Sequence, residues 1–422
     1  MREMKNSGIE WIGEIPNEWL VGRVKYIFTR KNEKAMQEDP IILSLTRSGV
    51  RVRDMSNNDG QIAESYYNYN PVIPGDFLLN PMDLYSGANC NVSYVYGVIS
   101  PAYINLRAKG QNSARYFDYF FKNQYWAMAM FAHGKGVSFD NRWTISAETL
   151  LNYSIPIPSI DEQKKIADFL DEKCAEINTV IEKTKATIEE YKKLKQSVIT
   201  QAVTKGIRSN RPMKDSGIEW IGEIPAEWDL RAIKTSFSVY AGATPKSEVP
   251  EFWDGDIRWI TPADYKTEDK FVEIGRRQIT LQGYNSCGTN LVPAGSIVFS
   301  KRAPIGSVAI CKTELCTNQG CLSCVPIHRL NIDFFYFVLS VLTEIFNLFG
   351  SGTTFKEISY DSFVNFRLPY PNVEEQNEIA DYLDKKCSEI DELITKKTSL
   401  LSELESYKKS LIYEYVTGKK EV

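Results

Sequence analysis

The sequence predicts an α+β protein in which two mixed α/β domains alternate with two long helices that pair as an antiparallel coiled coil. The ten-residue sequence Ser-Gly-Ile-Glu-Trp-Ile-Gly-Glu-Ile-Pro at 7–16 recurs unchanged at 216–225. Each copy ends in a helical segment of about 45 residues with apolar side chains at heptad spacing. The bodies before these segments contain short apolar runs bounded by Gly and Pro, which is typical of strands. An antiparallel pair of these helices would place the two bodies at opposite ends, related by an approximate two-fold axis.

The two copies can be aligned at both ends. The ten-residue repeat has an offset of 209 residues, whereas the Glu-Gln pairs at 162–163 and 375–376 have an offset of 213. Solenoid repeats are much shorter, about 20–50 residues, so the repeated unit is a whole domain followed by a helix. The predicted domains are 1–159, helix 160–209, 210–372 and helix 373–422.

Within the bodies, a few segments indicate particular elements. Residues 76–79 and 296–299 follow Pro-Gly and Pro-Ala-Gly turns and are expected to be strands. Residues 92–104 are rich in Val, Tyr and Ile around Gly97, as in a hairpin. Aromatic residues at 115–131 predict a buried helix, which 332–349 would match in the second copy.

The two long segments are the clearest prediction. Apolar or small residues recur in steps of three and four in both, interrupted by Lys195 in the first and by Lys397 and Lys408 in the second. The first series is Leu170, Cys174, Ile177, Ile181, Thr184, Ile188, Tyr191, Val198 and Ala202. Each helix would span roughly 65 Å at 1.5 Å per residue. Its apolar stripe needs a partner, and the simplest is the other helix of the same chain. Packing of each helix on a separate protein is the alternative.

Composition sets limits on function. The net charge is −4; residues 1–159 hold 16 basic and 15 acidic side chains, and 210–372 hold 16 and 18. Neither body is basic, so DNA binding would have to depend on local clusters. No apolar run approaches the ~20 residues of a membrane span, and the N-terminus lacks the apolar stretch of a signal peptide. We therefore expect a cytoplasmic protein without a membrane partner, whose cysteines are reduced thiols.

No convincing catalytic group is found in the sequence. His133 and His328 are the two histidines, and neither lies in a triad or metal motif. No phosphate-binding Gly-rich loop follows a strand. The sequence Asn-Pro-Met-Asp at 80–83 lacks the second proline and the aromatic residue of the amino-methyltransferase loop that it superficially matches.

The cysteines are expected to be structural. Four lie between 311 and 324, but only Cys321 and Cys324 form the tight pair that zinc sites prefer, and the first copy has no equivalent. Small apolar strand residues are the favoured interpretation. Cys174 and Cys387 occupy matching positions and are expected to pack in the helix seam.

The layout resembles the specificity subunit of type I restriction–modification systems. The resemblance covers nearly the whole chain and rests on the repeated opening segment and on Ile-Pro-Ile-Pro at 155–158 and Leu-Pro-Tyr-Pro at 368–371, each followed by Glu-Gln and Ile-Ala-Asp. Gly-Thr-Thr-Phe-Lys-Glu-Ile at 352–358, Ala-Pro-Ile-Gly at 303–306 and Ser-Pro-Ala-Tyr at 100–103 add to it. The first copy departs from the pattern at 134–139 and lacks an equivalent of Ala-Gly-Ala-Thr-Pro at 241–245.

This resemblance implies a non-catalytic protein with two target-recognition domains, each reading one half of a split site in double-stranded DNA. The helices would act as spacer and as a dock for two methyltransferase subunits. The chain would bind no cofactor itself; S-adenosylmethionine would belong to the methyltransferase subunits, and ATP and Mg²⁺ to restriction/translocase subunits.

Candidate DNA contacts are basic, hydroxyl and aromatic side chains in expected loops. In the first body they are Arg47, Arg51, Arg53, Tyr67, Lys135 and Arg142. If extended, 47–53 would place its three arginines on one face. In the second body they are Thr244, Lys246, Arg277, Lys301, Arg302, Thr353, Thr354 and Lys356. Strand alternation would point Lys301 and Arg302 to opposite faces, so that one of the two reaches DNA.

Trp11, Trp19, Trp220 and Trp228 recur in both copies and are expected to serve packing or partner docking. Two other functions stay open at this point. The first alternative is a coiled-coil interaction scaffold with two domains that bind no DNA, such as lectin-like or peptide-binding bodies. The chain would otherwise be a stand-alone DNA methyltransferase or nuclease, against which the missing cofactor and metal motifs argue.

Overall fold

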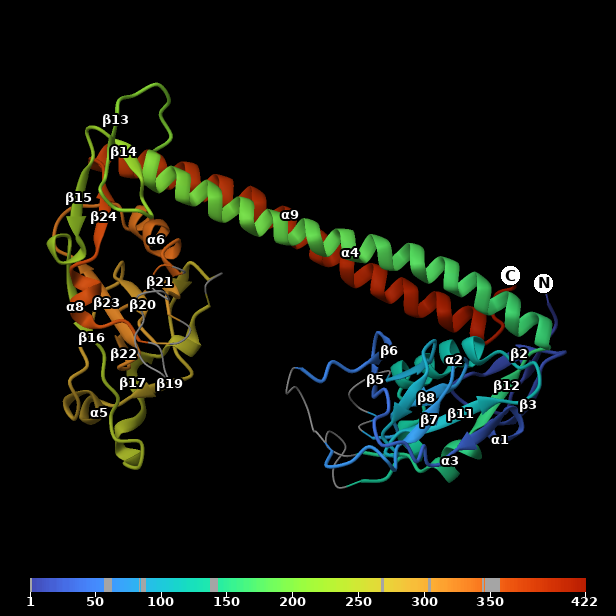
Figure 1. Cartoon of the computed structure of the whole chain (residues 1–422). Helices are drawn as coiled ribbons and strands as arrows, with labels where there is room; N and C mark the ends of the chain where they lie inside the picture. The colour runs from blue at the N-terminus through green and yellow to red at the C-terminus, as the bar shows by residue number, and fades with distance from the viewer. Residues whose placement is uncertain are drawn as a thin grey trace. The chain divides into compact units, whose positions relative to one another are not determined.

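The computed structural model describes residues 2–56, 63–82, 84, 89–136, 143–266, 269–302, 305–343, 345 and 357–422. It divides into two compact units, one formed by Met1–Lys185 with Ser399–Val422 (unit 1) and the other by Ala186–Thr398 (unit 2). Helices α4 (Ile160–Lys205) and α9 (Val373–Val416) each run from one unit into the other (Figure 1). Short strands and helices make up both bodies, in agreement with the predicted α+β class.

Unit 1 is built on a four-stranded antiparallel sheet in the order β4-β11-β8-β9. Its strands are β4 (Phe28–Lys31), β8 (Phe77–Leu79), β9 (Cys90–Val92) and β11 (Ile104–Ala108). Four strand pairs surround it: β1 (Met4–Asn6) with β2 (Glu14–Pro16), β3 (Leu20–Arg23) with β12 (Ser154–Ile157), β5 (Leu43–Thr46) with β6 (Gly49–Val52), and β7 (Asn70–Val72) with β10 (Gly97–Ile99). The short helices are α1 (Val24–Ile27), α3 (Ala147–Leu151) and a 3₁₀ turn at Phe131–His133.

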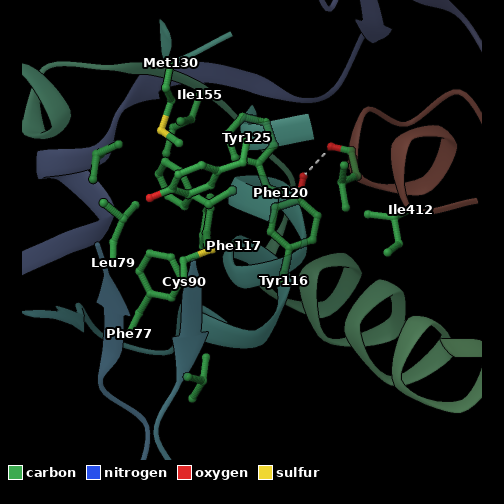
Figure 2. Packing of buried hydrophobic residues seen from close by; sticks show 14 of the residues in the cluster. Phe77, Leu79, Cys90, Tyr116, Phe117, Phe120, Tyr125, Met130, Ile155 and Ile412 are labelled. Atoms are coloured by element: carbon green, nitrogen blue, oxygen red, sulfur yellow. Dashed lines mark hydrogen bonds between the residues drawn. The ribbon is translucent and has the colours of Figure 1, made fainter. Parts of the chain in front are cut away.

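Helix α2 (Ala114–Trp126) fills the core of unit 1, as the aromatic run predicted. The Ser113 side chain accepts a hydrogen bond from the Tyr116 amide and so caps the first turn. Phe117, Phe120 and Phe121 are fully buried. The Tyr116 hydroxyl donates to the Val416 carbonyl of α9 at 2.9 Å, and Ile412 packs into the same cluster (Figure 2). The end of α9 is therefore part of this core.

Unit 2 repeats the plan with a larger sheet. Its five strands are ordered β16-β23-β20-β21-β18, and a second sheet is ordered β19-β17-β22. The strands of these two sheets are β16 (Phe237–Ala241), β17 (Trp253–Ile260), β18 (Phe271–Val272), β19 (Arg277–Ile279), β20 (Ile297–Ser300), β21 (Val308–Cys311), β22 (Cys316–Thr317) and β23 (Cys321–Pro326). In two further pairs, β13 (Met213–Asp215) lies beside β14 (Glu223–Pro225), and β15 (Asp229–Ala232) lies beside β24 (Arg367–Tyr370). The helices are α5 (Leu281–Asn285), α6 (Ile332–Ser340) and α8 (Tyr360–Val364), with 3₁₀ turns at Ile233–Thr235, Pro250–Phe252 and Pro262–Asp264.

The predicted hairpin at 92–104 is wrong. Strand β9 pairs with β8, and β10 pairs with β7, so the two strands on either side of Gly97 are not partners of each other. Turn chemistry and β propensity identify strands but not which distant strand each will meet. The strands expected at 76–79 and 296–299 are present as β8 and β20.

In each unit the two long helices pack in opposite directions. In unit 1, Phe169 meets Tyr415 with ring centroids 4.5 Å apart, and further along α4 Asn178 meets Lys408. In unit 2, Lys195 meets Asp391, and Arg208, just beyond α4, meets Glu378. Residue numbers rise along one helix as they fall along the other. Cys174 and Cys387 are buried in these seams, as predicted.

A carboxylate ties the start of each long helix to its body; Glu375 is buried, whereas Glu162 is half-buried. The Trp19 indole N–H donates to Glu162 at 2.8 Å, and that of Trp228 donates to Glu375 at 2.8 Å. An arginine pairs with each carboxylate and lies over the same indole, 5.8 Å from the ring centroid for Arg2 and 5.2 Å for its counterpart in unit 2, Arg211. We call each tryptophan–glutamate–arginine set a latch.

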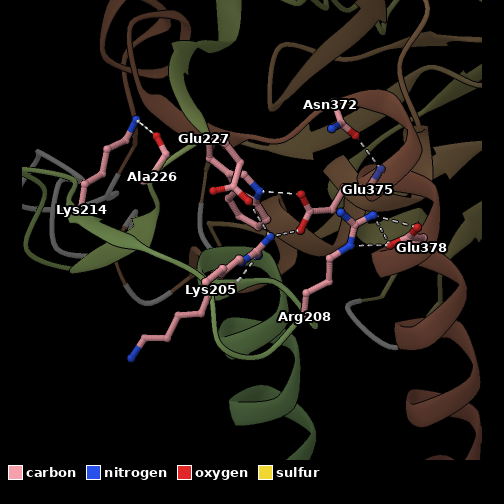
Figure 3. A network of polar contacts seen from close by, with 10 residues as sticks. Lys205, Arg208, Lys214, Ala226, Glu227, Asn372, Glu375 and Glu378 are labelled. Carbon is pink, nitrogen blue, oxygen red and sulfur yellow. Dashed lines mark hydrogen bonds and ion pairs between the residues drawn. The ribbon is translucent and has the colours of Figure 1, made fainter.

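Further polar contacts surround the latch of unit 2. The Asn372 side chain accepts a hydrogen bond from the Glu375 amide at 2.9 Å, and Arg208 pairs with Glu378 at 2.7 Å (Figure 3). Trp19 and Trp228 are 0% and 1% exposed, which confirms the packing role predicted for them. The repeated tryptophan and glutamate thus have a structural explanation.

The four cysteines between 311 and 324 are buried in β21, β22 and β23, which confirms the strand interpretation. Burial raises the pKa of all four thiols, to about 12 for Cys311. Within the described ranges no His, Cys, Asp and Glu side chains gather in a group of three that could hold a metal ion. None of the described helices is long and apolar enough to cross a membrane.

Candidate nucleic-acid interface

Three connections of unit 2 leave its main sheet at the same edge. Strands β16 and β20 both pair antiparallel with β23, so their C-terminal ends lie at the edge where β23 begins. Ala241 is in register with Leu322, and Ser300 is in register with Cys321. The segments 242–249, 301–302 and 318–320 therefore start or end side by side. We call this place the reading edge of unit 2.

The first connection is held by two tryptophans. The Trp253 indole donates to the Lys246 carbonyl at 3.1 Å, and the Trp259 indole donates to the Ala243 carbonyl at 3.0 Å. Any Cβ at Gly242 would lie 2.2 Å from the carbonyl oxygen of Asn318, so glycine is required there. The predicted residues Thr244 and Lys246 thus project from a fixed loop.

The third connection supplies a residue that the sequence did not single out. The Thr244 hydroxyl donates to the side-chain carbonyl of Gln319, whose side chain is exposed. The Asn318 side chain accepts from the Gly320 amide at 2.9 Å and fixes the turn. Because the amide oxygen of Gln319 is held, its NH₂ group is oriented and remains available as a donor. No motif pointed to Gln319, because its neighbours come from strands far apart in the sequence.

Arg277 lies beside the first connection. Its guanidinium stacks 3.8 Å from the centroid of the Trp253 ring, and the same ring holds Lys246. Such stacking leaves the edge of a guanidinium available for hydrogen bonds. Strand β19 therefore brings a predicted contact residue next to Lys246.

Lys301 and Arg302 do not point to opposite faces, so that prediction is wrong. Strand β20 ends at Ser300, and alternation no longer applies beyond it. Both side chains bind the Glu357 carboxylate, at 2.8 and 2.9 Å. Burial alone would raise the pKa of Glu357, but the hydrogen bonds from both cations outweigh it and lower that pKa. Thr353, Thr354 and Lys356 lie outside the described residues.

The equivalent edge of unit 1 carries different side chains. Here β4 and β8 end where β11 begins, with Lys31 in register with Asn105 and Leu79 in register with Ile104. Two predicted residues, Tyr67 and Lys135, are bonded to the segments that follow these strands. Tyr67 is bonded to the segment after β4, because the Met36 amide donates to its backbone carbonyl at 3.1 Å.

Lys135 reaches the same edge through its own pairing. It forms a β-bridge with Thr144, and the next residue, Ile145, donates to the Pro81 carbonyl just after β8. We call the segments around Tyr67 and Lys135 the reading edge of unit 1. Arg142 falls in a part of the chain that the structure leaves undescribed.

The three arginines of 47–53 are not on one extended face. Arg47 lies in the turn of the β5–β6 hairpin, whereas Arg51 is on β6 and donates to Ser48 at 2.9 Å. The Asn91 side chain donates to the Thr46 carbonyl at 2.7 Å and attaches the hairpin to β9. Arg53 follows the strand, where its amide donates to the Ile42 carbonyl at 2.8 Å. Arg47 is thus separated from Arg51 and Arg53 by a turn.

The Asn-Pro-Met segment at 80–82 is occupied by structural contacts. The Asn80 side chain accepts a hydrogen bond from the Met82 amide at 3.0 Å. The Asn80 backbone carbonyl accepts one from the Tyr125 hydroxyl at 2.6 Å. His133 packs against the Tyr153 ring with centroids 5.2 Å apart. These described residues thus make structural contacts that hold the segments around them.

Known proteins resemble this chain in sequence, and others resemble it in fold. Residues 16–190 and 225–403 match the family described as type I restriction modification DNA specificity domain. The type I restriction enzyme MjaIX specificity subunit of Methanocaldococcus jannaschii is 37% identical over 166 residues, which is 39% of this chain and 38% of that protein. The MjaVIII specificity subunit of the same organism is 23% identical over 409 residues, 87% of this chain and 86% of that protein.

The match to the first of these relatives thus spans well under half of its length, and the match to the putative MjaX specificity subunit of the same organism spans 54%. A solved structure titled for complex assembly and conformational transition of the type I R-M system has a TM-score of 0.75 at 16% identity, covering 96% of this chain and 99% of its own. The HsdS subunit of Thermoanaerobacter tengcongensis has a TM-score of 0.53 at 15% identity, covering 96% and 98%. These two likenesses concern the fold. With the family match over both bodies, this chain belongs to the type I restriction modification DNA specificity family and carries its domain twice.

Proposed function

We propose that the chain is the DNA-binding specificity subunit of a type I restriction–modification enzyme, and that each unit reads one half of a split, asymmetric site. One observation carries the proposal. The main sheets share one strand plan, yet the same edge presents Thr244, Lys246 and Gln319 in unit 2 and Tyr67 and Lys135 in unit 1. Base edges are read by such donors and acceptors, so different sets read different sequences.

The duplicated opening segment supports docking of two identical partners. Glu10 and Glu14 in unit 1 and Glu219 and Glu223 in unit 2 are exposed, although most of the residues that flank them are buried or half-buried. Packing does not require identity at exposed positions. Two methyltransferase subunits that bind these acidic positions through one basic surface would require it.

The long helices would complete the arrangement as a spacer. We infer that α4 and α9 pair antiparallel along their whole length as a coiled coil, which would relate the two units by an approximate two-fold axis. The opposite helix directions inside each unit support this inference. A spacer of fixed length would set the distance between the two half-sites.

The chemistry would belong to the partners. The chain would bind DNA without catalysing a reaction, S-adenosylmethionine would bind to the methyltransferase subunits, and ATP and Mg²⁺ would serve restriction/translocase subunits. Such a division leaves the loops of this chain free to diverge without affecting catalysis.

Co-expression with methyltransferase subunits, followed by single-molecule sequencing of host DNA, tests the proposal. We expect methylation at one split, asymmetric sequence only when both components are present. The isolated chain is expected to methylate no duplex. Methylation by the chain alone, or a complex that modifies the same sites without it, would contradict the proposal.

A further inference from the structure

The two units differ by one charge where their helices meet. In unit 2, Lys195 donates to both oxygens of Asp391, at 2.7 and 2.6 Å. The offset of 213 residues takes Lys195 to Lys408 and Asp391 to Asn178. In unit 1, Lys408 accordingly donates to the side-chain oxygen of Asn178 at 2.7 Å. A neutral amide stands where the other unit has a carboxylate.

Two carboxylates of the unit 1 body, Asp118 and Asp171, already have other partners. Asp118 pairs with Lys122 at 2.6 Å, and Asp171 accepts from Arg115 and from the Tyr119 hydroxyl. A carboxylate already paired with a cation contributes little to a second one. Neither of these two therefore replaces the carboxylate that Asp391 provides in unit 2.

The surroundings of Lys408 make its charge costly. Burial is the main cause that lowers the pKa of Lys408, and Lys122 lowers it further. Cys174 and Glu405 oppose this shift, but burial raises the pKa of the Cys174 thiol, which keeps it neutral near pH 7. A partly desolvated ammonium of this kind gains from an added anion.

A cavity of about 740 Å³ opens beside this lysine. It lies among the β5–β6 hairpin, α2 and the two long helices, all within unit 1. Four cationic side chains and one acidic side chain line it: Arg47, Lys122, Lys408, Lys409 and Glu182. Ser48 and Asn91 add a hydroxyl and an amide, and the Lys409 ammonium lies 5.9 Å from the Trp126 ring centroid.

We propose that this cavity is a phosphate site and that it holds one backbone phosphate of the DNA bound by unit 1. A phosphodiester carries the single negative charge that Asp391 supplies to the equivalent lysine. Lysine, arginine, serine and asparagine side chains are the usual partners of DNA phosphates. The exposed Arg51 on the same hairpin extends the positive surface beyond the cavity. This proposal rests on the proposed DNA-binding function. The contact would fix the register of unit 1 on the DNA backbone.

Asn178→Asp tests the site with a contact that the protein already uses in its other unit. The new carboxylate should pair with Lys408 as Asp391 pairs with Lys195, so the chain should fold normally and keep its thermal stability. Binding of the chain with its methyltransferase subunits is measured on a duplex bearing the methylated site, across a series of salt concentrations. Because each phosphate contact contributes roughly 0.9 to the slope of log K against log salt, we expect the slope to fall by about 1.

Val180→Asp is the matched control. It adds the same charge two residues away on α4, about 200° around the helix, at an exposed position outside the cavity. Its slope should equal that of the unchanged chain, and Lys408→Met should reproduce the loss seen with Asn178→Asp. The methylated sequence should be the same for all variants, since a phosphate contact carries no sequence information.

An unchanged slope for Asn178→Asp and Lys408→Met would overturn the proposal. If, in addition, inorganic phosphate raised the thermal stability of the unchanged chain and both variants lost this effect, the cavity would be a site for free phosphate and not for DNA. Failure of the unchanged complex to bind any duplex would instead refute the proposed function itself. The two failures are therefore distinguishable.

Discussion

Gln319 is the residue whose placement adds most to the reading edge of unit 2. Its side-chain oxygen is held by the Thr244 hydroxyl, which fixes the direction of the NH₂ group. A glutamine presented in this way suits hydrogen bonding to a base edge. Lys246 and Arg277, which also lie at this edge, are cations, and cations suit phosphates as well as bases.

We expect Gln319→Ala to relax the sequence requirement at one base pair of one half-site. A lost base contact should cost about 1–3 kcal/mol of discrimination. Methylated-site sequencing of the complex would measure this. Gln282→Ala, at an exposed position on α5, is the control and should leave the site unchanged. Equal effects of both changes would show that Gln319 reads nothing.

A second residue-scale prediction concerns the latch of unit 2. Trp228→Phe removes the indole N–H that donates to Glu375, a carboxylate whose side chain is 1% exposed. A hydrogen bond to a charged group contributes about 1.5–3 kcal/mol. We expect the free energy of unfolding of unit 2 to fall by a similar amount, measured in denaturant.

A double-mutant cycle separates this bond from lost packing. Glu375→Gln, alone and combined with Trp228→Phe, should reveal a coupling of about 0.5–3 kcal/mol. Strict additivity of the two changes would mean that the tryptophan acts through its volume alone.

At the scale of elements, the sequence predicts what is local. Heptad spacing predicted α4 and α9, and the aromatic run predicted α2, because helical contacts join residues three or four apart. The hairpin at 92–104 failed because β9 and β10 each pair with a non-adjacent strand. The directions predicted for Lys301 and Arg302 were wrong because both side chains bind Glu357, which lies 55 residues beyond Arg302. The reading edges depend on such distant pairings.

The proposed spacer role of the helices leads to an element-scale prediction. Inserting seven residues within 183–192 of α4, with seven more in the facing part of α9, should lengthen the pair by ~10 Å. Seven residues preserve the heptad register, so the seam should stay intact. Site sequencing should then show the same two half-sites separated by a longer gap. An unchanged gap would refute the role of the helices as a ruler.

At the scale of the molecule, the two units should act independently on DNA. Lys135→Ala should weaken recognition of one half-site and Lys246→Ala recognition of the other, because each lysine belongs to the reading edge of a different unit. Distant sites that share no partner are usually additive. Binding of duplexes with one half-site scrambled would measure each effect. Loss of both half-sites after a single substitution would contradict this division.

Unit 1 is assembled from two separate stretches of chain, whereas unit 2 is continuous. Leu411, Ile412 and Val416 belong to the core of unit 1, and Tyr116 bonds to Val416 some 300 residues away. During synthesis, the first body to emerge from the ribosome must therefore wait for the last helix before its core can close. A chain interrupted anywhere before that helix would leave apolar surface exposed, and it would be a target for proteolysis. A chain that includes α9 is therefore needed to complete the core of unit 1.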